Sequence, residues 1–218
     1  NWQTIKKNIK PTFIKKNSLE YNYDKEINFM GGNEFRDFNI SSLRFFSKNI
    51  DTIHITNNST YNAPIYSVRL KQDQNRSHKP YFEKYDLNGK LIIQKDNCYS
   101  PENESEYVMV KFNLEQKELN EHEKIYIFGS LSNWNINSKF LLQYNHKTKN
   151  FEKEVLLKQG YYNYQYITKK ENEITTDLIE GNYYETNNEY TIYVYHKSPW
   201  ERYERLVGIE KITSNSLN

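Results

Sequence analysis

Alternation of apolar and polar residues is the feature that most constrains this chain. Every second residue between Tyr107 and Leu114 is apolar, namely Val108, Val110, Phe112 and Leu114. Such a period of two places one row of side chains on a buried face of a β-strand. Similar patterns recur along the chain, and no segment of good length carries a helical period. The sequence therefore predicts an all-β protein built from two antiparallel β-sandwich domains.

Three further stretches carry more detailed expectations. Residues 124–128 read as a central strand with both faces covered, and Tyr162, Tyr164 and Tyr166 should stack along one side of another strand. In the segment from Thr191 to Tyr195, alternation places Ile192 and Val194 on the inner face and the tyrosines on the outer one.

The aromatic content decides between a folded and a disordered chain. Hydrophobic residues make up only 36% of the sequence, a low value that on its own favours disorder. However, aromatics reach 16%, with 20 Tyr among them, whereas disordered chains are poor in aromatics. Tyr and Phe bury large areas and favour pleated surfaces. We therefore expect a folded β protein with a polar exterior.

Charge and cysteine content exclude some classes of function. The net charge is +2, from 30 basic and 28 acidic residues, which is too balanced for a nucleic-acid or anionic-membrane binder. The single cysteine, Cys98, forms no intrachain disulfide, so cysteine usage does not decide the compartment. No apolar run reaches the roughly 18 residues of a membrane span, and no signal peptide is visible. The chain opens without an initiator Met, so we expect a processed product or part of a longer protein.

A polar stretch from Lys95 to Glu106 divides the strand-rich sequence. We place a domain boundary there, with a β-sandwich domain over 1–103, N-terminally incomplete, an Ig-like early-set sandwich over 104–211 and a flexible tail over 212–218. Within the first domain, Asn88-Gly89 predicts a hairpin turn that joins strands at 81–85 and 91–94.

The residues that usually carry catalysis show no recognisable pattern. None of the five histidines lies three to five residues from another histidine or from Cys98, so no local metal-ligand pair exists. Nucleophile elbows and phosphate-binding loops are absent as well. The pair Gly31-Gly32 predicts a positive φ or a close backbone approach in a turn before Phe35. We predict no catalytic, cofactor-binding or metal-binding residue and expect a binding protein rather than an enzyme.

Two segments of the C-terminal half carry a recognisable pattern, Ile125–Trp134 and Gly160–Tyr166. In these segments the chain resembles the early-set sandwich modules that bind glycogen and starch. The resemblance implies that Trp134 stacks on a sugar ring. Two departures weaken this implication, because Gln165 stands where the family has Lys and residues 169–173 replace the hairpin with the second Trp. Glycan binding with Trp134 as the platform is the alternative function.

A second resemblance covers nearly the whole chain. The segment from Met30 to Arg44 is similar to the signature of the type 9 secretion system plug family, and further matches follow in order. They comprise 79–93, 106–112, 125–134, 159–166, 179–190 and 202–208. The matches correspond to the C-terminal half of that family, which implies that an N-terminal β portion is absent here.

This second resemblance implies a non-catalytic gating subunit. It would lie in the periplasm and associate with the outer membrane through the large β-barrel translocon subunit of that system. Docked on the periplasmic opening, it would seal the pore, and it would need no cofactor, nucleic acid or membrane span of its own.

Candidate contact residues follow from residue type, because Trp, Tyr and Arg are common interface anchors. The candidates are Arg36, Asp37, Arg44, Trp134, Trp200, Arg202 and Tyr203. The same residues fit a structural role equally well: Arg36 and Asp37 can pair with each other or with core backbone, and the aromatic rings can seal the sandwich.

Overall fold

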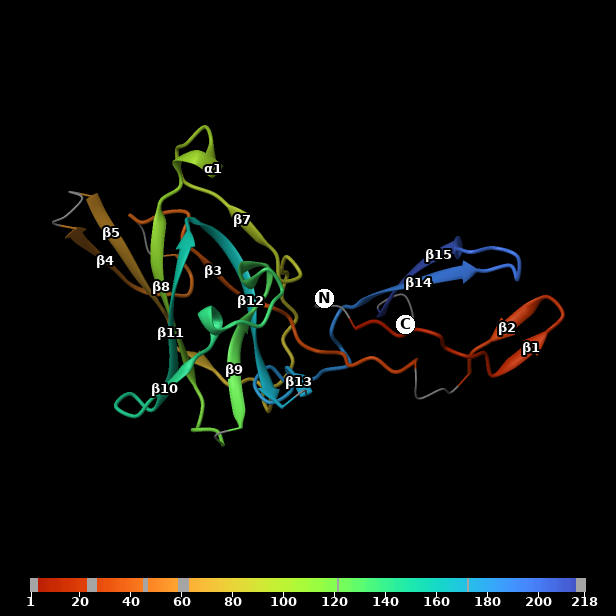
Figure 1. Ribbon diagram of the computed structural model, residues 1–218. Helices are drawn as coiled ribbons and strands as arrows, with labels where there is room; N and C mark the ends of the chain where they lie inside the picture. The colour runs from red at the N-terminus through yellow and green to blue at the C-terminus, as the bar shows by residue number, and fades with distance from the viewer. Residues whose placement is uncertain are drawn as a thin grey trace.

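The structure, a computed structural model, describes residues 4–22, 27–44, 47–58, 63–120, 122–171 and 173–214. These residues form strands, one short α-helix and short 3₁₀ turns (Figure 1). The elements are β1 (Phe13–Lys15), β2 (Ser18–Glu20), β3 (Arg36–Asn39), β4 (Ile50–Asn58), β5 (Ala63–Leu70), β6 (Asp73–Gln74), β7 (Leu91–Ile93), α1 (Pro101–Glu104), β8 (Tyr107–Glu115), β9 (Glu123–Phe128), β10 (Gln143–Asn145), β11 (Asn150–Lys158), β12 (Gly160–Lys170), β13 (Glu173–Thr175), β14 (Glu189–His196) and β15 (Arg205–Thr213). The predicted all-β class is confirmed.

Two sheets face each other to form a sandwich. The first has the order β10-β11-β8-β5-β4, and β6 also pairs with β8. In the second, the long strand β12 pairs with β3, β7, β9 and β13. Most pairs are antiparallel, whereas β5 and β6 run parallel to β8. Among the described residues neither sheet closes into a barrel, so both sheets keep free edges.

The core lies between the sheets and follows the predicted alternation. Val108, Val110, Phe112 and Leu114 are all fully buried. From the opposite sheet, the ring of Phe38 stacks on Tyr162 at 5.0 Å between centroids and meets Phe112 edge to face at 5.5 Å. Such aromatic pairs stabilise the fold by more than the burial of their apolar area alone. The expectation for Tyr162, Tyr164 and Tyr166 is also confirmed, because all three are buried along one side of β12. For residues 124–128, both faces are covered from Ile125 to Ile127, but β9 is not a central strand. Among the described strands it pairs with β12 alone, and a single bridge joins Tyr126 to Leu141.

The predicted boundary between residues 103 and 104 does not separate two packing units. β3 pairs with β12, so that Phe38 lies opposite Tyr162, and β5 pairs with β8. Strands from both sides of the boundary thus share both sheets. The polar stretch 95–106, which contains α1, is a surface connection between β7 and β8 (Figure 1). Its polarity reflects exposure to solvent rather than a linker between domains.

The turn at Asn88-Gly89 is confirmed, but the strand expected before it is not. Both residues have positive φ, 51° and 74°, and β7 follows. Residues 81–85 form no strand. Instead, the Lys84 ammonium reaches the Asp37 carboxylate, and the Leu87 N–H donates to the Asn163 side chain. Side-chain contacts therefore hold this segment against the outer face of β3 and β12 in place of a backbone ladder.

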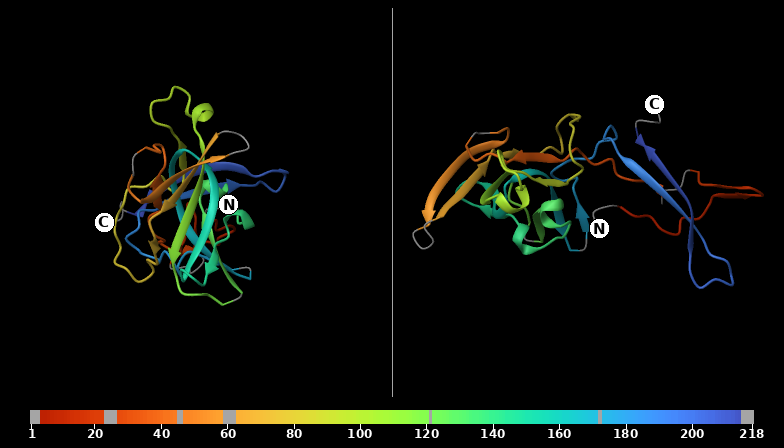
Figure 2. Two further views of the ribbon diagram at one scale, coloured as in Figure 1. Left: turned by 90° about the vertical axis from the view of Figure 1, so that its left-hand side faces the viewer. Right: turned by 90° about the horizontal axis from the view of Figure 1, so that it is seen from above.

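Two hairpins extend beyond the sandwich. Within the part of the chain that the structure describes, β1 pairs only with β2, and β14 pairs only with β15. Both hairpins project from the same end of the body (Figures 1 and 2). β15 continues through Thr213, so residues 212 and 213 belong to a strand rather than to the predicted tail; residues 215–218 lie outside the described residues.

Candidate functional site: a buried ion cluster, a neck and an exposed ribbon

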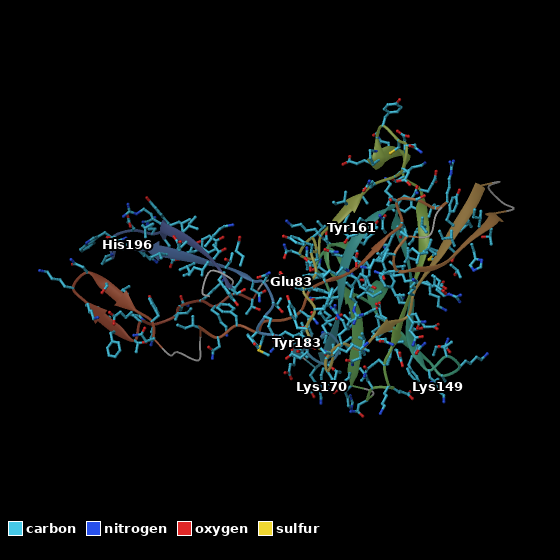
Figure 3. The ribbon with its side chains drawn as sticks, turned by 180° about the vertical axis from the view of Figure 1, so that it is seen from behind. Glu83, Lys149, Tyr161, Lys170, Tyr183 and His196 are labelled. Atoms are coloured by element: carbon cyan, nitrogen blue, oxygen red, sulfur yellow. The ribbon has the colours of Figure 1, made fainter. Side chains whose placement is uncertain are left out.

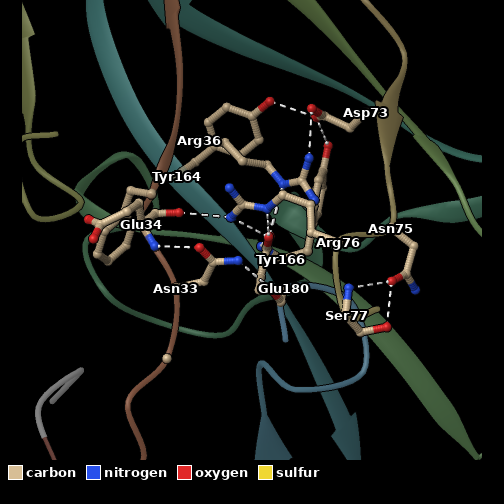
Figure 4. Close-up of polar contacts among 12 residues, drawn as sticks. Asn33, Glu34, Arg36, Asp73, Asn75, Arg76, Ser77, Tyr164, Tyr166 and Glu180 are labelled. Carbon is tan, nitrogen blue, oxygen red and sulfur yellow. Dashed lines mark hydrogen bonds and ion pairs between the residues drawn. The ribbon is translucent and has the colours of Figure 1, made fainter. Parts of the chain in front are cut away.

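An ion cluster lies at the end of the sandwich nearest the hairpins. The Arg36 guanidinium donates to both carboxylate oxygens of Glu180, at 3.0 and 3.1 Å, and to Asp73 at 3.0 Å. Arg76 donates to the same Glu180 carboxylate at 2.8 and 2.5 Å. Figure 4 shows how these side chains converge from segments that are distant in the sequence.

Tyrosine hydroxyls complete the ion cluster. Tyr164 and Tyr166 both donate to one oxygen of Asp73, at 2.6 and 2.8 Å. The Tyr166 N–H donates to Glu180, and the Arg36 guanidinium lies 5.2 Å from the centroid of the Tyr166 ring. Arg36 is thus engaged inside the protein, and it does not pair with Asp37. The role of Glu180 could not be predicted from the sequence, because its partners Arg76 and Arg36 are 104 and 144 residues away.

The protonation state of the cluster follows from its geometry. Burial acts to raise the pKa of the Glu180 carboxyl, but Arg36 and Arg76 outweigh this effect and hold the pKa below its ordinary value. For Tyr164 and Tyr166, burial and the neighbouring Asp73 carboxylate raise the pKa well above the usual range. Glu180 is therefore ionised and both tyrosines are neutral at physiological pH. Every charge is paired within the cluster, which suits a cross-link between segments.

A neck, defined here as residues 29–34 and 180–188, joins the sandwich to the hairpins. The Tyr183 N–H donates to the Gly32 carbonyl at 2.9 Å, and the Asn188 amide donates to the Gly31 carbonyl at 2.8 Å. A Cβ atom at Gly31 would lie 1.9 Å from the Tyr183 carbonyl oxygen, so only glycine fits there. Gly32 has a φ of +75°. The prediction of a close approach and a positive φ at this pair is confirmed.

The outer face of β3 holds Asp37. Its carboxylate accepts from Lys84 and from the Tyr161 hydroxyl, the latter at 3.0 Å. Arg36 and Asp37 point to opposite sides of the strand, as the period of two requires. Arg44 is exposed on the connection that follows β3. The three signature residues Arg36, Asp37 and Arg44 thus have three different environments.

Trp134 is part of an aromatic cluster. Its ring meets Phe128 at 5.6 Å and Phe35 at 6.2 Å between centroids, in edge-to-face geometry. A Cβ added at Gly89 would lie 2.4 Å from the indole. Trp134 is half-buried, and these contacts indicate that it helps to seal the end of β9 beneath the turn at Gly89.

The remaining candidates lie far from the cluster, at the tip of the β14–β15 hairpin. Trp200 is 94% exposed and Tyr203 65% exposed, and Arg202 is exposed beside them. The body of this hairpin is exposed too. Ile192 and Val194, expected on an inner face, are 48% and 49% exposed. That prediction is wrong for the described residues, because no second layer covers either strand (Figure 3).

An open hollow of about 600 Å³ lies over β10 and β11 and contains Lys111, His146, Glu152 and Glu154. Burial acts to raise the pKa of Glu152, but hydrogen bonds from Lys111, Asn145 and Thr148 outweigh it and lower the pKa. Its carboxylate is therefore held ionised. Among the described residues, no group of three or more His, Cys, Asp or Glu is placed to hold a metal ion. Likewise, no helix in the described part of the chain is long and apolar enough to cross a membrane.

Comparison with known proteins identifies a similar solved structure. No family model matches the chain, and no curated protein matches it. The crystal structure of a hypothetical protein from Parabacteroides merdae matches with a TM-score of 0.81 and 36% sequence identity. The match covers 93% of this chain and 50% of that chain. This chain therefore spans about half the length of the solved chain that it resembles.

Proposed function

We propose that this chain is a non-catalytic plug subunit of the type 9 secretion system. It docks in the periplasm on the opening of the outer-membrane β-barrel translocon and closes it. The proposal rests first on the motifs that resemble the plug family. Two of them, residues 30–44 and 179–190, are separated by more than a hundred residues in the sequence, yet they contact each other in the neck and the ion cluster. Their contact supports the view that the motifs belong to one inherited architecture.

The observation that supports docking best is the exposure of three aromatic side chains in one segment. Between residues 82 and 99, Phe82 is 80% exposed, and Tyr85 and Tyr99 are essentially fully exposed. We call residues 82–99 the strap. Lys84 and Leu87 hold its first part against β3 and β12, and β7 within it pairs with β12. Exposed aromatic side chains on a rigid support are typical of protein interaction sites. The strap is therefore the surface that we assign to the translocon.

Pull-down of the tagged protein from outer-membrane extract in gentle detergent tests the proposal. We expect mass spectrometry to identify the giant barrel among the retained proteins. Replacing Phe82 and Tyr85 with Ser should weaken recovery at least about fivefold, as for loss of interface anchors. Tyr184→Ser is the matched control, because Tyr184 is 88% exposed but lies outside the strap. Absence of the barrel from the wild-type pull-down would contradict the proposed function.

The alternative, glycan binding through Trp134, receives less support from the geometry. Stacking on a sugar requires an open ring face, and Trp134 instead packs against Phe35 and Phe128 beneath Gly89. Affinity electrophoresis in starch, glycogen and peptidoglycan gels provides the test. We expect no retardation of the wild-type chain; retardation that Trp134→Ala abolishes would favour the alternative.

A further inference from the structure

The β14–β15 hairpin, called the ribbon here, carries large apolar and aromatic side chains on both of its faces. In its register, Tyr193 lies opposite Ile209 and Tyr195 opposite Leu206, which groups these four on one face. Each of them is between 46% and 57% exposed. The other face carries Ile192 and Val194, which are exposed to a similar degree. Strands that are apolar on both faces are typical of the interior of a sheet whose two sides are covered.

The ribbon has no such cover among the described residues. It is a two-stranded sheet with both outer edges unpaired, and an isolated hairpin of this kind is marginally stable in water. Apolar strands with free edges also favour pairing with another chain. The β1–β2 hairpin repeats the pattern, because Ile14 and Leu19 lie opposite each other and are 77% and 56% exposed.

The neck holds the ribbon on the side of the sandwich where the β1–β2 hairpin also lies (Figure 2). Phe29 packs on Tyr190 at the base of the ribbon, with ring centroids 5.4 Å apart. The Asn188 amide binds the Gly31 carbonyl, and the Ser214 N–H donates to the Asn188 carbonyl. The ribbon is thereby presented by a braced support, which is the arrangement that an interface requires.

The comparison with the solved structure indicates what covers this face. The 7% of this chain outside the match is about 15 of its 218 residues, fewer than the stretch from Glu189 to Thr213. Part of the ribbon therefore belongs to the region shared with the Parabacteroides merdae chain. That chain contains as much polypeptide again, because only 50% of it is matched. That chain thus has enough further polypeptide for a second unit of similar size.

We propose that the ribbon and the β1–β2 hairpin form the docking face for a second folded unit, equivalent to the half of the Parabacteroides merdae chain that this chain does not span. The unit covers the apolar faces and extends the ribbon by pairing with its free edges. This surface is separate from the strap, so the proposal stands or falls independently of docking to a translocon.

Hydrogen–deuterium exchange on two intact proteins tests this proposal. The samples are the 218-residue chain and the complete Parabacteroides merdae protein. Peptides from residues 189–213 should exchange at least about tenfold faster in the 218-residue chain than their equivalents in the longer protein, because local protection follows burial. Peptides from β8 and β12 serve as the internal control and should be protected in both proteins. Equal exchange of the two ribbons would overturn the proposal.

Two further measurements exclude other occupants. Light scattering should show a monomer for the 218-residue chain; a dimer with a protected ribbon would instead assign the face to a second copy. In the 218-residue chain, Tyr193→Glu combined with Ile209→Lys should reduce the fluorescence of an apolar dye, whereas Tyr184→Ser should not. In the Parabacteroides merdae crystal structure, the unmatched half must lie against the strands equivalent to β14 and β15, and strands facing solvent there would contradict the proposal.

Discussion

Glu180 is the acidic residue at the centre of the ion cluster. Its side chain is 1% exposed and receives hydrogen bonds from Arg36, Arg76 and the Tyr166 backbone. Removing one partner of a buried ion pair is costly because it leaves the other charge without compensation. The same residue connects the 177–181 turn to β3, to β12 and to Arg76 beyond β6, so its loss affects the ion cluster and the neck together.

Replacing Glu180 with Gln should lower the free energy of unfolding by about 3–5 kcal/mol, because Arg36 then remains buried with only Asp73 as a charged partner. Urea titration followed by tyrosine fluorescence measures this change. Glu173→Gln is the matched control, because Glu173 is exposed on β13, and it should change stability by less than about 0.5 kcal/mol. Equal free energies of unfolding for the two variants would show that the ion cluster contributes little to stability.

The lowered pKa of Glu180 also predicts a dependence of stability on pH. A carboxyl whose pKa is lower in the folded state stabilises the protein above its unfolded pKa, about 4.3 for Glu. This contribution disappears as the pH falls from there through the folded pKa. The difference in unfolding free energy between wild type and Glu180→Gln should therefore be constant above about pH 5 and shrink below about pH 4. A difference that stays constant down to pH 2.5 would contradict the assignment.

At the scale of elements, the neck shows how two distant segments fix the direction of the ribbon. Residues 29–34 and 180–188 exchange backbone and side-chain hydrogen bonds, and the two segments lie side by side only because Gly31 lacks a Cβ. The strap provides a second example. Its turn at Asn88-Gly89 is local, whereas its position on β3 depends on Lys84 and on the Asn163 side chain.

Gly31→Ala should distort the neck, because the new methyl group would meet the Tyr183 carbonyl at 1.9 Å. Overpacking of this kind costs about 1–3 kcal/mol. Thermal unfolding should show the loss, and hydrogen exchange should rise in residues 182–190. Gly208→Ala is the control, since its methyl group would meet only Val194, at an ordinary 3.7 Å. Similar unfolding temperatures for both variants would refute the close approach.

At the scale of the whole molecule, stability is concentrated in the sandwich. Its core unites both sheets around Phe38, Phe112 and Tyr162, whereas the ribbon buries little of its surface. Regions with few buried contacts open at low free energy. The molecule thus combines a well-packed sandwich with hairpins whose apolar side chains remain exposed.

Limited trypsin digestion should reflect this difference. Cleavage at Lys197 and Arg202, in the exposed loop between β14 and β15, should precede any cleavage within β8 or β12 by at least about tenfold in rate. Mass spectrometry of the early fragments measures the order. Early cuts at Lys111, inside β8, would indicate that the sandwich is less stable than its core implies.

The sequence by itself determined strands such as β8 and the direction in which their side chains face. Alternation from Val108 to Leu114 encodes one buried row, and Gly31-Gly32 encodes a backbone that a side chain would block; both are local properties. Only the tertiary structure decided which strands pair, that Glu180 neutralises Arg36, and that the ribbon lies outside the sandwich. A period of two shows that Ile192 and Val194 share a face, but burial depends on whether another layer covers that face. That layer comes from distant polypeptide, and local periodicity carries no information about it.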